Sequence, residues 1–323
     1  MALVHERLKR RLMMIIFLSF FLFLGGFIYG MYLLRSGLFD LTTDVLKKWP
    51  IKRMDHPWKC MLTGIMITAI LQNHLAVLVI TSRLVSTRFI TFYQSIGIML
   101  GAYIGKTITT EIITLNLQVS VIPMVLVGAI FYFMNIKNFD HMGYVLIGTS
   151  LIFGSLWGFE ITASFMKDSD YMHDLCATLD QNHLYAFLVG TVFTAISQSS
   201  TAAIGLTMSF LTTEIMSLAT GIVILLGAKI GTCLMMLLAT IGAEKEATLT
   251  ALSYTWLNIF CVALIYPLMN LFVNLGMHLS AHPHIQLAHV IVISHVIISF
   301  IVLPFVEKFG AFILTLYSYK INK

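Results

Sequence analysis

A cluster of hydroxyl and amide side chains lies inside an apolar stretch in the second half of the chain. Buried polar groups of this kind are costly unless they are hydrogen-bonded. Together with free backbone N–H groups at a broken helix, they can hold an oxyanion. Their oxygens can also coordinate a small hard cation, whereas the simpler alternative is packing of small polar residues between membrane helices. The cluster comprises Thr194, Ser197, Gln198, Ser199, Ser200 and Thr201.

This stretch has a counterpart earlier in the chain. Residues 62–105 align with residues 188–231 at a constant offset of 126, without a gap, and 16 of the 44 aligned pairs are identical. In the first copy Gln72 matches Gln198, while Asn73 and His74 stand where the second copy has serines. A doubled apolar unit that contains buried polar residues is typical of transporters built from repeats.

The composition places the chain in a membrane. It is 58% hydrophobic and 11% charged, with a mean hydropathy of +0.89, whereas soluble domains are about 45–50% apolar and about 25% charged. Several apolar runs reach the roughly 20 residues that a spanning helix needs. We therefore predict an all-α, polytopic membrane protein: a first repeat over 1–136, a second over 137–245, and C-terminal transmembrane helices over 246–323.

The charges that flank the two copies predict their topology. Basic residues precede and follow the segment 60–82, among them Lys52, Arg53, Lys59 and Arg83, whereas acidic residues flank the second copy. Because basic loops stay in the cytoplasm, a re-entrant hairpin would keep both basic flanks of 60–82 on one side. We therefore predict two inverted-topology repeats, each with a re-entrant helical hairpin and a broken helix. The alternative is an ordinary helix with a polar face toward the bundle.

The motifs resemble those of the sodium-dependent phosphate cotransporters, whose signature is a Gln-Ser-Ser-Ser motif followed by Gly-Ala-Asn-Ile-Gly-Thr-Thr in each of two inverted repeats. The second copy has Gln-Ser-Ser-Thr over 198–201 and Gly-Ala-Lys-Ile-Gly-Thr-Cys over 227–233. The first copy has Gln-Asn-His-Leu over 72–75 and Gly-Ala-Tyr-Ile-Gly-Lys-Thr over 101–107. The segment 26–38 is similar to the opening helix of that family.

This resemblance implies a multi-pass protein of the cell membrane that moves phosphate, or a similar oxyanion, by sodium-coupled symport with alternating access. The residues it implies for substrate binding are Gln198, Ser199, Ser200, Thr201, Gln72, Asn73 and Lys229. Those it implies for ion binding are Thr194, Gly227, Gly231, Thr232, Thr68, Gly101, Gly105 and Thr107. Sodium would be the coupling ion, and we expect no enzyme activity, no other cofactor or metal, and no nucleic-acid partner. The sequence specifies no oligomeric state.

The chain also departs from the family pattern. The first copy lacks the serines, Tyr103 and Lys229 replace the two asparagines, and Lys106 replaces a threonine. Cations inside a membrane protein are costly and usually functional, so Lys229 would substitute for a bound sodium ion or pair with phosphate; alternatively, it extends to the interface. The weakened first motif leaves a second hypothesis open, namely a membrane partner or sensor that does not transport.

Overall fold

The computed structural model describes residues 2–47, 55–115, 121–134, 139–167 and 169–317, and every regular element in these ranges is helical. Among the described residues, six helical stretches are long and apolar enough to cross a membrane: Met14–Thr42, Phe92–Thr114, Phe139–Lys167, Leu218–Ala239, Lys245–Ile265 and Pro283–Leu316. The predicted all-α, polytopic class is thereby confirmed. Lys52 and Arg53, which support the hairpin prediction, lie outside the described residues.

The duplication is reproduced helix by helix. α2 (Pro57–Leu71) and α3 (His74–Ser86) form a pair of short helices in the first copy, and α9 (His183–Ser197) and α10 (Ser200–Thr212) form the second pair. Every bound differs by 126 between the copies. The backbone agrees too, because the non-glycine residues with positive φ in the described chain are Gln72, Arg88, Gln198 and Glu214, which form two pairs with the same offset.

The next helix is where the two copies differ. In the first copy α4 (Phe92–Gly105) ends before Lys106, and α5 (Thr107–Thr114) follows it. In the second copy α11 (Leu218–Ala239) runs without a break through Gly227, Gly231 and Thr232, the counterpart of Lys106. The broken helix that we expected in each repeat is therefore absent from α11, and in the first copy the interruption is limited to Lys106, whose backbone angles are themselves helical (φ −65°, ψ −21°).

The Gly-rich motifs instead bring helices together. A Cβ on Gly101 would collide with the carbonyl oxygen of Met61 in α2, and one on Gly64 with that of Ile98 in α4. The equivalent Gly190 and Gly227 make the same reciprocal approach between α9 and α11. Small residues at a helix crossing allow backbones to approach closely, so α2 packs on α4 as α9 packs on α11.

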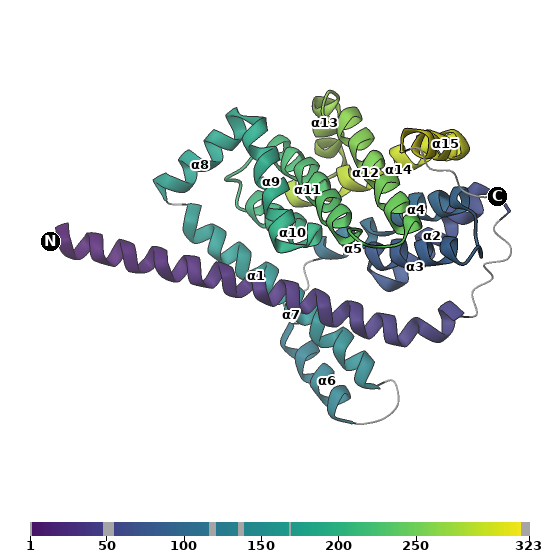
Figure 1. The fold of residues 1–323 in the computed structure, drawn as a ribbon. Coiled ribbons are helices and arrows are strands. Elements are labelled where there is room, and N and C mark those ends of the chain that lie inside the picture. Colours follow the sequence, from purple (N-terminus) through teal and green to yellow (C-terminus); the bar gives the residue numbers. More distant parts are fainter. Residues whose placement is uncertain (1, 48–54, 116–120, 135–138, 168, 318–323) are drawn as a thin grey trace.

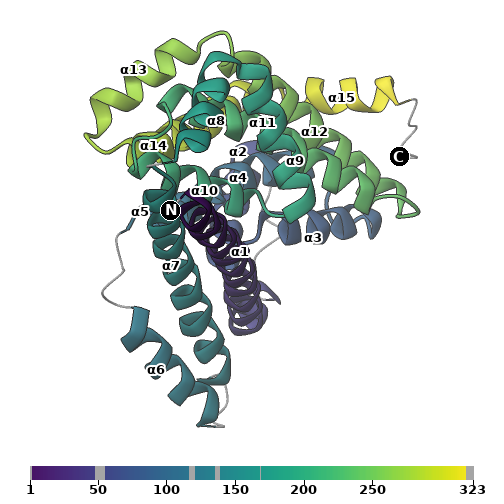
Figure 2. The same ribbon diagram turned by 90° about the vertical axis from the view of Figure 1, so that its left-hand side faces the viewer.

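A long first helix crosses the molecule. α1 (Ala2–Lys47) packs along α7 (Phe139–Lys167), to which α6 (Val121–Phe133) is attached. Figures 1 and 2 show α6 and the first half of α7 on one side of α1 and the paired helices of both copies on the other. α8 (Asp170–Gln181) leads into the second copy, and its Asp180 accepts hydrogen bonds from the backbone N–H and the hydroxyl of Ser217 at the start of α11.

The C-terminal helices complete the core. They are α12 (Lys245–Ile265), α13 (Met269–Leu279), α14 (Pro283–Val302), the 3-10 turn η3 (Leu303–Phe305) and α15 (Val306–Leu316). Pro267 and Pro304 lie at the interruptions of the two apolar runs, as expected because proline cannot continue the helical hydrogen-bond pattern. α12 and α14 pack against both copies, so side chains from the C-terminal part reach the centre of the molecule.

Candidate functional site

The break in each helix pair falls on its glutamine. Gln72 ends α2 with φ 50° and ψ 23°, and Gln198 ends α9 with φ 52° and ψ 26°. This left-handed conformation is uncommon for a residue with a side chain, and it turns the backbone between the two helices of the pair. The following residue starts the next helix, since the side chain of Asn73 accepts a hydrogen bond from Ala76 N and that of Ser199 from Ala202 N, each at 3.2 Å.

We call the turns at residues 72–73 and 198–199 the tips of the two helix pairs. The two tips and α1 border a cavity of about 530 Å³. The first copy contributes Asn73, the second contributes 196–199, and α1 contributes one face, including a half-buried arginine. Its lining residues are Ile28, Met31, Tyr32, Arg35, Ser36, Phe39, Asn73, Ile196, Ser197, Gln198 and Ser199. We call this cavity the tip pocket. The fold thus brings together polar residues that are far apart in the sequence.

The charge distribution in the tip pocket favours an anion. Arg35 supplies a guanidinium group, whose Nε donates a hydrogen bond to the carbonyl oxygen of Gln72 at 3.3 Å. None of the described residues that line the pocket is acidic. α3 begins directly after Asn73 and α10 directly after Ser199, so the N-termini of two helices lie at the pocket, and helix N-termini attract anions.

The structure separates the predicted substrate residues into two groups. Asn73, Gln198 and Ser199 line the tip pocket, whereas Ser200 and Thr201 lie in the first turn of α10 outside its lining. The side chain of Gln72 is turned away: its Nε2 donates to the carbonyl oxygen of Ala69 at 2.6 Å, and its Oε1 accepts from Thr109. Gln72 and Thr109 line a different cavity, of about 470 Å³.

Lys229 lies in a buried polar network instead of the tip pocket. Its Nζ is 3.0 Å from the hydroxyl of Tyr103 and 2.9 Å from Nε2 of His295. Tyr103 is the residue that matches Lys229 in the first copy, so these equivalent positions contact one another. The ammonium group therefore faces the centre of the protein, in contrast to the interfacial alternative.

The predicted ion-binding residues also fall into two groups. The hydroxyl of Thr107 donates to the carbonyl oxygen of Ile104 in α4, and that of Thr232 to the carbonyl oxygen of Ala228 in α11. The glycines of both motifs lie at the helix crossings. By contrast, Thr68 and Thr194 are fully buried, and neither hydroxyl has a hydrogen-bond partner in the described part of the chain. These two threonines are repeat equivalents, which makes them the residues of the set best suited to donate an oxygen to a cation.

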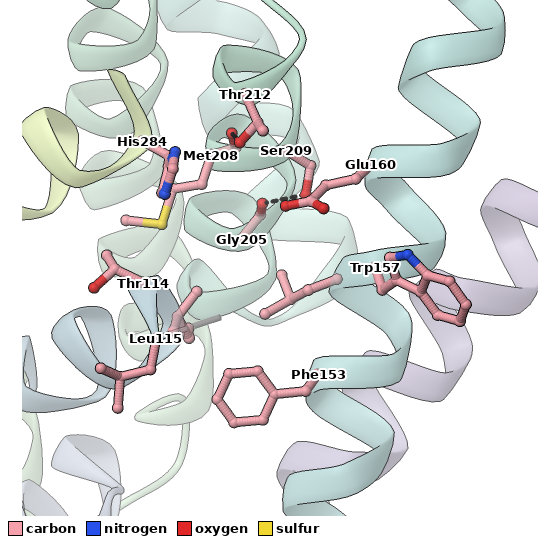
Figure 3. A pocket seen from close by; sticks show the side chains of 12 residues that line it. Thr114, Leu115, Phe153, Trp157, Glu160, Gly205, Met208, Ser209, Thr212 and His284 are labelled. Carbon is pink, nitrogen blue, oxygen red and sulfur yellow. Dashed lines mark hydrogen bonds between the residues drawn. The ribbon is translucent and has the colours of Figure 1, made fainter. Parts of the chain in front are cut away.

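A second polar cavity differs in charge. It encloses about 120 Å³ between α5, α7, α10 and α14, and it contains Glu160, Ser209, Thr212 and His284. Figure 3 shows Glu160 beside Ser209, with His284 projecting from α14. Because a carboxylate repels an oxyanion, this cavity is less suited to an anion than the tip pocket.

Two important residues were not among those predicted for the site. They are Arg35, which the sequence motifs do not include, and Tyr103, which the motifs mark only as the replacement of an asparagine. A signal for Arg35 was available, because an arginine that follows about two dozen apolar residues is unusual inside a membrane helix. Its proximity to the hairpin tips depends on the crossing of α1 over both copies, which local sequence does not specify.

One family of known proteins matches the chain twice, once in each copy. The family described as "Na+/Pi-cotransporter" matches residues 27–161 and, a second time, residues 156–285. The chain belongs to this family. Each match begins in the helix that packs beside its copy, α1 for the first and α7 for the second, and together the matches include both hairpin tips. No solved structure matches the chain.

Relatives of similar sequence occur in bacteria. The chain is 29% identical, over 296 residues, to "Uncharacterized protein YqeW" of Bacillus subtilis (strain 168), covering 92% of this chain and 96% of that protein. It is 23% identical, over 290 residues, to the Escherichia coli (strain K12) protein named "Putative inorganic phosphate export protein YjbB". That match covers 90% of this chain and 53% of the relative, so the chain spans about half the length of YjbB.

Proposed function

We propose that this chain carries inorganic phosphate across the cell membrane and binds it in the tip pocket. The observation that carries the proposal is the position of Arg35, whose guanidinium group lines the same cavity as Asn73, Gln198 and Ser199. A guanidinium is suited to oxyanions because its donors match two oxygens at once. Family membership and the name of the relative YjbB support phosphate as the anion.

The duplication supports transport by alternating access. The pocket is formed by one tip from each copy, so a movement of either pair of helices changes one wall and leaves the other in place. Transporters built from inverted repeats bind their substrates at such an interface, and each repeat can rock against the other. The inverted orientation of the copies is part of this proposal, and the phosphate leaves the cycle chemically unchanged.

Sodium coupling is the finer part of the proposal. We assign sodium binding to the neighbourhood of Thr68 in the first copy and of Thr194 in the second, whose buried hydroxyls have no partner in the described chain. Hydroxyl oxygens suit a hard monovalent cation, and the hydroxyls lie one turn before the glutamines of the tips. A sodium ion bound there would be close enough to influence the break in each helix pair.

The test is uptake of radioactive phosphate into liposomes that contain the purified full chain. We expect saturable uptake that is lost in Arg35→Gln and retained in Arg83→Gln, a matched control at an exposed position of α3. Uptake measured in sodium and in potassium buffer separates the transport proposal from the sodium proposal. Phosphate binding without uptake would favour the partner or sensor hypothesis. The absence of both binding and uptake would refute a phosphate site.

A further inference from the structure

A buried ammonium group lies where the two copies meet. Lys229 is 8% exposed, and its Nζ contacts the Tyr103 hydroxyl and His295 Nε2. Tyr103 and Lys229 occupy equivalent positions, so their contact marks the approximate symmetry axis of the duplication. Of these two equivalent positions, only the one in the second copy carries a positive charge.

The hydrogen bonds define which atoms donate. His295 Nδ1 lies 2.6 Å from the carbonyl oxygen of Ile291, which can only accept, so Nδ1 carries the proton and Nε2 of the neutral ring accepts from Lys229. The Tyr103 hydroxyl donates to Asn258 Oδ1 at 3.1 Å and therefore also accepts from Lys229. Asn258 in turn donates through Nδ2 to the carbonyl oxygen of Tyr254 at 2.8 Å.

The hydrogen-bond partners of Lys229 carry no negative charge. Its Nζ also lies 4.8 Å from the centre of the Tyr103 ring, and Lys106 places a second ammonium 5.0 Å from the same ring. Aromatic ring faces attract cations. Neither lysine forms an ion pair with a carboxylate in the described chain. A phenol oxygen, an imidazole nitrogen and a ring face thus hold one monovalent charge, as a set of neutral ligands would hold a bound cation.

The network around Lys229 extends to the region proposed to bind phosphate. Tyr254, whose carbonyl oxygen accepts from Asn258, has its hydroxyl 3.2 Å from Nε2 of His74. His74 is the first residue of α3, and it directly follows Asn73, which lines the tip pocket. In the poorly polarisable interior, a fixed charge such as the Lys229 ammonium favours an incoming anion without any ion having to enter with it.

We propose that the Lys229 ammonium does the work of one transported sodium ion. This inference rests on the proposed phosphate transport and concerns its stoichiometry: each phosphate crosses with one sodium ion fewer than it would if position 229 were neutral. Tyr103 and His295 act as positioning residues, because they hold the ammonium toward the axis between the copies.

The experiment measures sodium and phosphate uptake in parallel, with two radioisotopes, in liposomes that contain the full chain. We expect the sodium-to-phosphate ratio to rise by one in Lys229→Gln, which removes the charge, and to stay unchanged in Lys229→Arg, which keeps it. Lys308→Gln is the control for loss of a lysine at an exposed position of α15. An unchanged ratio in Lys229→Gln, with phosphate uptake intact, overturns the inference.

A second measurement covers the case in which Lys229→Gln does not fold. It repeats the two-isotope uptake with Lys229→Met, a neutral side chain of similar length, in which the sodium-to-phosphate ratio should also rise by one; an unchanged ratio overturns the inference. The two proposals fail differently. Absence of phosphate uptake in every buffer refutes the transport function itself, whereas an unchanged sodium-to-phosphate ratio in the neutral Lys229 variants refutes only the role of Lys229.

Discussion

The two hairpin tips share a backbone but differ in what their side chains do. In the first copy the Gln72 side chain is held by Ala69 and Thr109, and its carbonyl oxygen accepts from Arg35. In the second copy no hydrogen bond joins the exposed Gln198 side chain to another described residue, and Gln198 faces the tip pocket. The first tip is thus fastened to its surroundings, whereas the second is available to a ligand.

The comparison shows how a duplicated unit can specialise without changing its fold. Both copies keep the left-handed glutamine and the cap that follows it, because these residues determine the backbone. Two pairs that differ, Asn73 against Ser199 and Tyr103 against Lys229, have side chains that face the tip pocket or the contact between the copies. We therefore expect equivalent substitutions in the two copies to have unequal effects.

The largest expected difference is one of sidedness. In a chain without native cysteines, we expect Asp55→Cys and Ser86→Cys to react with an impermeant thiol reagent from the cytoplasmic side only. Their counterparts Gln181→Cys and Thr212→Cys should react only from the outside, since basic flanks stay in the cytoplasm. Labelling of intact cells and inverted vesicles provides the measurement. Reaction of positions 55 and 86 from opposite sides would exclude a hairpin in the first copy.

Arg35 should have the largest effect on affinity. We expect Arg35→Gln to weaken phosphate binding by about 10- to 100-fold, because a hydrogen bond to a charged group contributes about 1.5–3 kcal/mol. Arg35→Lys should lie between, since a lysine keeps the charge but not the paired donors. Phosphate titration of the purified variants is the measurement, and an unchanged affinity in Arg35→Gln would move the site away from the tip pocket.

The serines of the second tip should not be equivalent. Ser199→Ala removes a residue that lines the pocket and caps α10, so we expect phosphate affinity to fall by about 1–3 kcal/mol and thermal stability to fall as well. Ser200→Ala, outside the pocket lining, should change affinity by less than about twofold, a difference below 1 kcal/mol. Equal losses in the two variants would show that the bound state rearranges the tip.

The two glutamines should separate affinity from stability. We expect Gln198→Ala to weaken phosphate binding by about threefold, within the range of a single neutral hydrogen bond. Gln72→Ala should leave affinity nearly unchanged but lower the free energy of unfolding by about 1–2 kcal/mol, because Thr109 loses its acceptor. Phosphate titration and thermal unfolding of both variants are the measurements. Loss of affinity in Gln72→Ala and loss of stability in Gln198→Ala would contradict this prediction.

Much of the fold could be predicted because the two copies can be aligned with each other, which locates their equivalent elements. The offset of 126 locates both helix pairs, and the polar residues in apolar runs mark both tips. The site was less accessible, because Arg35 reaches the pocket only through the crossing of α1. From C-terminal helices outside the repeat, His295 reaches Lys229 and Asn258 reaches Tyr103. Contacts between distant helices depend on packing, which spacing along one segment does not encode.

The reciprocal glycine contacts also determine which parts of the molecule can hinge. α2 touches α4, and α9 touches α11, backbone against backbone at Gly64, Gly101, Gly190 and Gly227. Because no side chains lie between the backbones at these crossings, we expect α2 to move with α4, and α9 with α11, as rigid bodies. α3 and α10 lack such a contact with these partners, so the compliant torsions are those at Gln72 and Gln198. α3 and α10 would then be the gates of this protein, each rotating about the glutamine at its tip.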